Sequence, residues 1–280
     1  MLSRAALDPI LRQALAEDIG PGDVTTEAVL TGDERGRARA IAKSDLVVAG
    51  AEVFREVFTL LDTSLKVALS RRDGDQARPG DTLAELNGRL GSILTAERTA
   101  LNFFQRLCGI ATLTRRFVEE IDGTGARILD TRKTAPGLRL LDKYAVRVGG
   151  GRNHRFALFD GVLIKDNHIA AAGGIADAVA KVRSTVAHLM KIEVECKNAA
   201  EVEEALTAGA DAVMLDNMDL PAMREAVALV RGRVPLEASG NVTLANVRRV
   251  AETGVDFISV GALTHSVAAA DISLDIQRGT

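Results

Sequence analysis

Short apolar runs alternate with longer amphipathic stretches through the second half of the chain. The runs predict buried strands at 128–129, 162–164, 192–194, 212–215, 236–238 and 257–260. Helical patterns lie between them at 175–182, 199–208, 221–230 and 244–251. The strand ends recur roughly every 20 to 30 residues, close to the βα unit of a parallel barrel. The sequence therefore predicts six or seven βα units, fewer than the eight of a regular barrel.

The first third of the chain mixes strands and helices. Its patterns predict helices at 5–18 and 51–61 and strands within 36–50, at 65–69 and at 82–86. Thr95 is a candidate N-cap for a long helix that reaches 121. We expect a first domain at 1–112, joined by the tail 266–280, and a second domain at 113–265.

Composition narrows the range of functions. The chain has 280 residues, a net charge of -3, one Tyr and no Trp. It has neither a basic field nor an aromatic platform, so we expect no nucleic-acid partner. No apolar run approaches the roughly 18 residues of a membrane span, and no secretory pattern is present, so we expect no membrane partner. Cys108 and Cys196 lie far apart without a CxxC, which indicates a reduced, cytoplasmic compartment and no structural zinc.

Positive charge is concentrated in one stretch of this slightly acidic chain. Between 128 and 165 the basic residues outnumber the acidic ones, and they are Arg132, Lys133, Arg139, Lys143, Arg147, Arg152, Arg155 and Lys165. Arg132, Lys133 and Lys165 come soon after apolar runs, and the carboxyl ends of barrel strands share one mouth. The sequence therefore predicts a pocket for a small, multiply charged anion.

Carboxylates and glycine-containing loops follow the other predicted strands. Glu195 and Asp216 close two apolar runs and are suited to a divalent metal or to sugar hydroxyls. We expect Glu193 and Glu195 to face opposite sides of their strand, with only Glu195 in the mouth. The loops at 239–241 and 259–262 follow the last two strands, where barrels often bind phosphate, although an ordinary turn fits equally well.

Nine segments spread over nearly the whole chain carry a more specific signal. They are EDIGPGDVTT, AERTALNFFQRLCGIAT, LDTRKTAPGLR, KYAVRVGGGRNHR, LIKDNH, EVEC, MLDN, EASGNVT and GVDFISVGALTHS. Each is weak alone, but in this order and spacing they resemble the quinolinate phosphoribosyltransferases, also called nicotinate-nucleotide pyrophosphorylases (carboxylating).

The resemblance implies an α/β fold with an N-terminal open-faced α/β sandwich and a C-terminal irregular, TIM-like α/β barrel. It implies phosphoribosyl transfer from phosphoribosyl pyrophosphate to the ring nitrogen of quinolinate with decarboxylation. The products would be nicotinate mononucleotide, pyrophosphate and CO2, in de novo NAD biosynthesis. It also implies Mg2+, no organic cofactor, and a homodimer or a larger assembly of dimers.

The resemblance also implies roles for residues. The quinolinate-binding residues would be Arg98, Arg132, His154, Arg155 and Lys165, with Lys133 near the pyrophosphate and Thr131 as a further substrate-binding residue. Glu195 and Asp216 would lie near the ribose and the metal, and the 5′-phosphate would bind Ser239, Gly240, Asn241, Val260, Gly261 and Ala262. The expected catalytic residues are Lys133, Lys165, Glu195 and Asp216, and Arg98 would enter the site of the neighbouring subunit.

Three other functions stay open. A related phosphoribosyltransferase, including the molybdenum-associated relatives, would act on another base. A sugar-phosphate lyase would use Lys165 as a Schiff base, which borohydride would trap as a covalent adduct. A non-catalytic anion-binding protein would bind without turnover, but it would have little use for Glu195 and Asp216.

Overall fold

The computed structural model describes residues 2–279, and these divide into two compact units. The first unit contains 2–115, Ala135–Gly150 and 266–279. The second contains Arg116–Thr134 and Gly151–His265. Residues 266–279 and Ala135–Gly150 therefore both group with the first unit, although Ala135–Gly150 lies within the range 113–265 predicted for the second domain.

An antiparallel sheet organises the first unit. Its strand order is β12-β1-β5-β3, with β12 at Ile272–Arg278, β1 at Arg35–Ala42, β5 at Thr82–Arg89 and β3 at Lys66–Leu69. A two-stranded sheet joins β2 (Leu46–Val47) to β4 (Gln76–Ala77). The helices are α1 (Arg4–Ile19), α2 (Val24–Val29), α3 (Ala51–Leu61), α4 (Leu90–Glu120) and α5 (Arg139–Val148).

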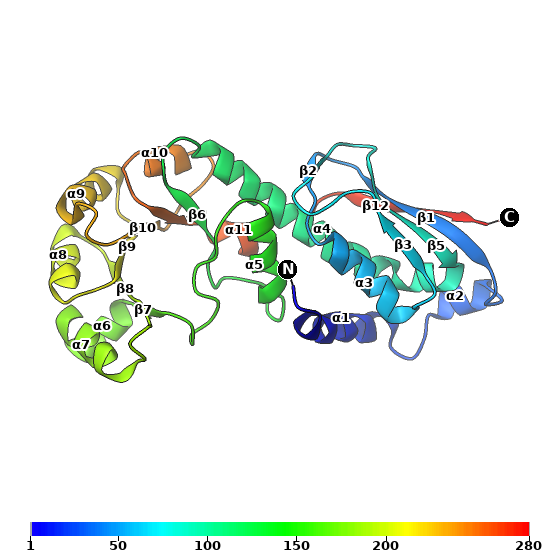
Figure 1. The fold of residues 1–280 in the computed structure, drawn as a ribbon, viewed down its shortest axis with the longest axis horizontal. Coiled ribbons are helices and arrows are strands. Elements are labelled where there is room, and N and C mark those ends of the chain that lie inside the picture. The colour runs from blue at the N-terminus through cyan, green and yellow to red at the C-terminus, as the bar shows by residue number, and fades with distance from the viewer. Residues whose placement is uncertain (1, 280) are drawn as a thin grey trace. The chain divides into compact units, whose positions relative to one another are not determined.

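The sheet is covered on one face. Strand β1 alternates between buried and exposed positions, with Ala38 and Ala40 inside and Arg37 and Arg39 outside. Helices α3 and α4 lie along the inner face (Figure 1). There the ring of Phe54 lies 5.1 Å from that of Phe58 and 5.0 Å from that of Phe104. The opposite face carries charged side chains, as an open-faced sandwich requires.

The start of α4 differs from the sequence prediction. The helix begins at Leu90, directly after β5, and not at Thr95. The Thr95 hydroxyl instead donates to Asp23 Oδ2 at 3.0 Å, and Asp23 is itself the N-cap of α2. The prediction was wrong because a strand that runs straight into a helix has no loop in which a cap signal can appear.

Six parallel strands organise the second unit. They are β6 (Arg127–Leu129), β7 (Val162–Ile164), β8 (Ile192–Cys196), β9 (Ala212–Asp216), β10 (Leu236–Ser239) and β11 (Phe257–Ser259). Their order in the sheet is β6-β11-β10-β9-β8-β7. The helices that follow them are α6 (Asp166–Ala172), α7 (Ile175–Thr185), α8 (Ala199–Thr207), α9 (Leu220–Val230), α10 (Val247–Ala251) and α11 (Ala262–His265).

The parallel order brings all six carboxyl ends to one edge. Helices α7 to α10 lie outside the curved row of strands (Figure 1). The register pairs Asp216 with Ser239, and Ser239 with Ser259, so residues that end successive strands are neighbours. Within residues 2–279, β6 and β7 form the two edges and do not pair, so the barrel is open there. The predicted α/β class and irregular barrel are confirmed.

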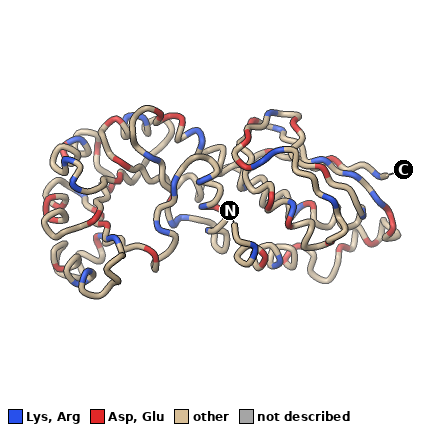
Figure 2. Tube along the Cα trace, in the orientation of Figure 1, with Lys and Arg blue, Asp and Glu red and all other residues tan. Residues whose placement is uncertain are grey.

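Two further observations concern the distribution of charge and the question of membrane-spanning helices. Along the described chain, basic and acidic positions are interspersed in both units (Figure 2). No helix among residues 2–279 combines the length and the apolar character that crossing a bilayer would need.

Candidate active site

A cavity of about 820 Å³ opens at the carboxyl ends of the strands in the second unit. Its lining includes every residue predicted for the site except Arg98: Thr131, Arg132, Lys133, His154, Arg155, Lys165, Glu195, Asp216, Ser239, Gly240, Asn241, Val260, Gly261 and Ala262. Arg98 belongs to α4 in the first unit, and its side chain is 61% exposed. The predicted residues other than Arg98 therefore line one cavity, and their roles remain predictions.

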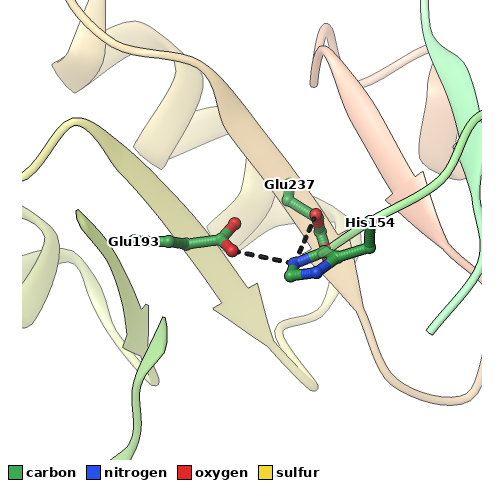
Figure 3. Close-up of side chains that lie close together, drawn as sticks. All are labelled: His154, Glu193 and Glu237. Carbon is green, nitrogen blue, oxygen red and sulfur yellow. Dashed lines mark hydrogen bonds and ion pairs between the residues drawn. The ribbon is translucent and has the colours of Figure 1, made fainter. Parts of the chain in front are cut away.

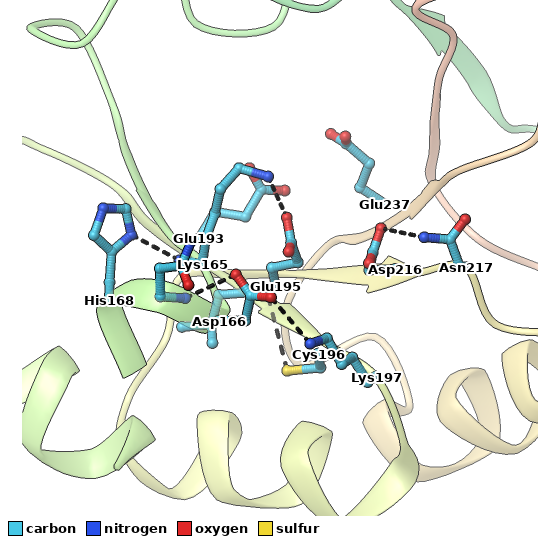
Figure 4. A network of polar contacts seen from close by, with 12 residues as sticks. Lys165, Asp166, His168, Glu193, Glu195, Cys196, Lys197, Asp216, Asn217 and Glu237 are labelled. Atoms are coloured by element: carbon cyan, nitrogen blue, oxygen red, sulfur yellow. Dashed lines mark hydrogen bonds and ion pairs between the residues drawn. The ribbon is translucent and has the colours of Figure 1, made fainter. Parts of the chain in front are cut away.

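Lys165 and Glu195 form the central ion pair. Lys165 follows β7, and its Nζ donates to Glu195 Oε2 from the neighbouring strand β8 (Figure 4). The Lys165 side chain is 46% exposed, whereas Glu195 is buried. His168 accepts a hydrogen bond from the Lys165 backbone N–H at 3.0 Å, so His168 closes the first turn of α6. The ammonium group is thus held at the cavity wall by one carboxylate.

Arg155 is a partly buried cation beside the cavity. Its Nη1 donates to the Gly161 carbonyl at 2.9 Å, which fixes the guanidinium beside the cavity. Partial burial, reinforced by the nearby charge of Arg132, lowers the pKa of Arg155, while Glu193 opposes that shift. Two arginines that repel each other in one cavity are stabilised by an anion, so the arrangement favours a negatively charged ligand.

Glu193 and Glu195 lie on the same face of β8, and the expectation that they face opposite ways was wrong. Side chains on a strand alternate with a period of two, so residues 193 and 195 point to the same side. Glu195 reaches Lys165 and Glu193 reaches His154. Figure 4 shows both on the inner side of the strands, with Cys196 on the other side.

His154 lies between two carboxylates. Its Nε2 is 2.9 Å from Glu193 Oε2 and 3.6 Å from Glu237 Oε2 (Figure 3). Its Nδ1 accepts the backbone N–H of Arg155 at 2.7 Å. A nitrogen that accepts cannot carry a proton, so the ring proton lies on Nε2 and is donated to Glu193. These contacts orient the ring of His154.

Glu237 was not predicted from the sequence. It lines the cavity from β10, is 3% exposed, and burial together with the charge of Glu193 raises its pKa to about 8. Burial thus favours the neutral, protonated form of Glu237. The sequence did offer a signal for Glu237. Side chains alternate along a strand with a period of two, so Glu237 lies on the same face as the predicted site residue Ser239.

Comparison with known proteins identifies the family. The model of the quinolinate phosphoribosyl transferase N-terminal domain matches residues 23–108, and that of the C-terminal domain matches residues 110–275. The chain belongs to the quinolinate phosphoribosyltransferase family. It is 45% identical over 275 residues to the probable nicotinate-nucleotide pyrophosphorylase [carboxylating] of Bacillus subtilis, covering 98% of this chain and 95% of that one.

Two solved structures of this family share the fold. The crystal structure of NadC from Streptococcus pyogenes has 41% identity and a TM-score of 0.96, covering 100% of this chain and 99% of that one. The nicotinate-nucleotide pyrophosphorylase from Francisella tularensis has 43% identity and a TM-score of 0.94, covering 99% and 98%.

Two groups of side chains were compared as possible metal ligands. His154, Glu193 and Glu237 offer ligand atoms within 4.8 Å of one another. A metal ligand at His154 Nε2 would need the proton on Nδ1, where the Arg155 N–H already points, so this cluster does not fit. Glu195 and Asp216 fit Mg2+ better, because both are carboxylates that line the cavity and Mg2+ prefers oxygen ligands.

The loops after β10 and β11 complete the cavity. A Cβ at Gly261 would lie 3.0 Å from His265 Cδ2 and 3.2 Å from Lys133 Cδ, so the backbone is closely approached there. Thr264 donates to the Lys133 carbonyl at 2.7 Å and ties the first turn of α11 to the loop after β6. Backbone N–H groups at such close-packed loops can bind phosphate oxygens.

Proposed function

We propose that this chain transfers the phosphoribosyl group of phosphoribosyl pyrophosphate to the ring nitrogen of quinolinate, with loss of CO2. The products are nicotinate mononucleotide and pyrophosphate, and the step belongs to de novo NAD biosynthesis. The observation that carries the proposal is one cavity whose lining combines cations, among them Arg132, Arg155 and Lys165, with the carboxylates Glu195 and Asp216. Family membership supports the same reaction.

Quinolinate is a dianion, and Arg132, Arg155 and Lys165 supply the positive charge that it requires. Each charge-assisted hydrogen bond contributes about 1.5 to 3 kcal/mol. Three such donors fix the ring in one orientation and hold its nitrogen toward the sugar, which removes most of the entropy loss of the encounter. His154, oriented by Glu193, supplies shape and a polar edge to the same wall.

Glu195 and Asp216 face the developing positive charge of the sugar. As pyrophosphate departs, the carbon that receives the ring nitrogen becomes cation-like, and nearby carboxylates stabilise it. We propose that the same two side chains hold Mg2+, which neutralises the charge of the leaving pyrophosphate. We propose that Lys133, which lines the cavity from the loop after β6, binds a pyrophosphate oxygen.

Loss of CO2 follows from the transfer itself. Once the ring nitrogen is bonded to the sugar it is positive, and the carbon–carbon bond to the adjacent carboxylate can break with its electron pair left on the ring carbon. That carbon then takes a proton. The chain needs to keep the ring in place through both steps, and the basic wall that bound the dianion does so.

The test is a direct assay. Pure protein, quinolinate, phosphoribosyl pyrophosphate and Mg2+ should release CO2 and form nicotinate mononucleotide, while nicotinate in place of quinolinate should not react. Lys165→Ala should abolish turnover. Lys191→Ala is the matched control, because that lysine also pairs with a carboxylate, Asp211, but is 82% exposed and lies outside the cavity. If the Lys165→Ala variant is as active as the Lys191→Ala variant, the proposal is refuted.

We also propose a homodimer in which Arg98 completes the site of the partner subunit. Support comes from the exposure of Arg98 and from its position outside the cavity lining. Light scattering should give twice the 29.7 kDa of one chain. A monomer that turns over at the full rate would contradict this assembly.

Finally, we propose a cytoplasmic location, which the two buried cysteines, both free thiols, support. Cell fractionation with an antibody tests it, and recovery in the membrane or secreted fraction would refute it.

A further inference from the structure

Two non-glycine residues with positive φ stand where β9 and β10 end. Asn217 has a φ of 53° and Asn241 a φ of 52°, and Gly240, which directly precedes Asn241, has a φ of 100°. This conformation is unfavourable for residues with a Cβ, although asparagine tolerates it. Such residues persist where neighbouring contacts hold them, and they concentrate at functional sites. Arg231 is the one other such residue within 2–279, and it lies outside the cavity lining.

Asn217 makes three hydrogen bonds, and two of them join the ends of β9 and β10. Its backbone N–H donates to the Ser239 carbonyl at 2.9 Å. Its side-chain Nδ2 donates to Asp216 Oδ1 at 3.0 Å (Figure 4), and its Oδ1 accepts from Asn241 Nδ2 at 3.1 Å. Because both amide atoms are used, the side chain cannot flip without breaking two hydrogen bonds.

The loop after β10 is built around this side chain. A Cβ at Gly240 would lie 2.1 Å from Asn217 Oδ1, so only glycine allows the loop to pass so close. Asn241 is held on its other side, because its carbonyl accepts from Asn246 Nδ2 at 2.9 Å. Asn246 Oδ1 in turn accepts the Thr243 N–H at 2.8 Å. The amide of Asn217 therefore belongs to a continuous chain that runs from Asp216 into the loop.

Asp216 gains a fixed orientation from the same contact. The hydrogen bond from Asn217 uses Oδ1 and leaves the second oxygen, Oδ2, for a ligand. A phosphoribosyl substrate has to reach both the carboxylate, at its ribose, and the loop 239–241, at its 5′-phosphate. A rigid link between these two places presets their separation before the substrate arrives, which reduces the entropy lost on binding.

We propose that Asn217 is a positioning residue that couples Asp216 to the phosphate loop and so sets the affinity for the phosphoribosyl substrate, not for quinolinate. The inference rests on the proposed function. The amide of Asn217 bonds to Asp216 and Asn241, which lie at other strand ends than Arg132, Arg155 and Lys165, so its loss should leave these basic residues in place.

Glycine variants test this without disturbing the backbone, since glycine adopts positive φ freely. Asn217→Gly removes both amide contacts, Asn241→Gly removes one, and Arg231→Gly is the matched control at a positive-φ position elsewhere in the unit. We expect Asn217→Gly to raise the KM for phosphoribosyl pyrophosphate about tenfold, as expected for one charge-assisted and one neutral hydrogen bond. The KM for quinolinate should stay within about twofold, Asn241→Gly should give a smaller rise, and Arg231→Gly none.

Two results would overturn the inference. One is an unchanged KM for phosphoribosyl pyrophosphate in Asn217→Gly. The other is an equal rise in both KM values, which would mean that the amide only maintains the cavity. Thermal melting shows whether Asn217→Gly is folded, and if it is not, Asn241→Gly carries the same comparison.

The proposed function fails separately, if the wild-type protein shows no turnover. In that case calorimetric titration with ribose 5-phosphate still tests the link, because Asn217→Gly must weaken that affinity as well. Equal affinities of the two proteins would then overturn it.

Discussion

Replacing Glu237 by Gln should stabilise the protein increasingly as the pH rises. Glu237 is 3% exposed, and the groups that face it are Glu193, His154, Ser259 and Asp130. Burial, and then the negative charge of Glu193, raise its pKa from 4.5 to about 8. Glutamine has nearly the shape of the protonated acid and cannot ionise, so Glu237→Gln isolates the charge.

The sign and size follow from proton binding. Between pH 4.5 and about 8 the unfolded chain loses the Glu237 proton while the folded chain keeps it. The free energy of unfolding of the wild type therefore falls with pH by about 1.4 kcal/mol per unit from this group. Glu237→Gln lacks that slope, so its stability relative to the wild type should rise by about 2 kcal/mol between pH 6 and pH 8.

Urea unfolding followed by far-ultraviolet circular dichroism measures this, since the chain has no Trp. Wild type and variant would be compared at pH 6, 7 and 8. Glu225→Gln on α9 is the control, because Glu225 is exposed and its replacement should leave the slope unchanged. If the stability difference between Glu237→Gln and wild type is the same at all three pH values, the buried carboxylic acid is not protonated and the reasoning is refuted.

Three further results are expected. Mixing Arg98→Ala and Lys165→Ala chains should restore part of the activity that each lacks alone, and no recovery after subunit exchange would place Arg98 outside the partner's site. Asp142→Asn should lower the free energy of unfolding by about 3 kcal/mol, because Asp142 is fully buried and accepts two hydrogen bonds from Arg106, at 2.9 and 2.8 Å. Chemical denaturation measures that loss, and a change below about 1 kcal/mol would contradict it. Chelation with EDTA should stop turnover and added Mg2+ should restore it, with the melting temperature unchanged; activity that persists in EDTA would refute the metal proposal.

Much of the fold could be read from hydrophobic periodicity. The helix predicted at 51–61 occurs as α3, and the predicted return of the tail occurs as β12, which pairs with β1. Strand ends were found because apolar runs stop abruptly where polar site residues begin, as at Lys165 and Asp216. Spacing alone was sufficient for this, because parallel strands put all such ends at one edge.

Other features depend on contacts that one sequence does not display. Glu237 sits inside an apolar strand, and its role becomes visible only when β8 and β10 bring it near Glu193. The amide of Asn217 is directed by a glycine 23 positions later, at Gly240. The misplaced Glu193 was a different kind of error, since the period of two already assigned it to the inner face.

The passage of the chain between its units has a practical consequence. Helix α5 buries Leu141, Ala145 and Val146 in the first unit, although 116–134 before it and 151–265 after it belong to the second. An expressed fragment that begins at 113 would contain α5 without the first-unit residues that bury its apolar side chains. Such a fragment would expose these side chains and aggregate. An engineered chimaera should therefore exchange the two units together. Alternatively, a fragment of the second unit should have residues 135–150 replaced by a short linker.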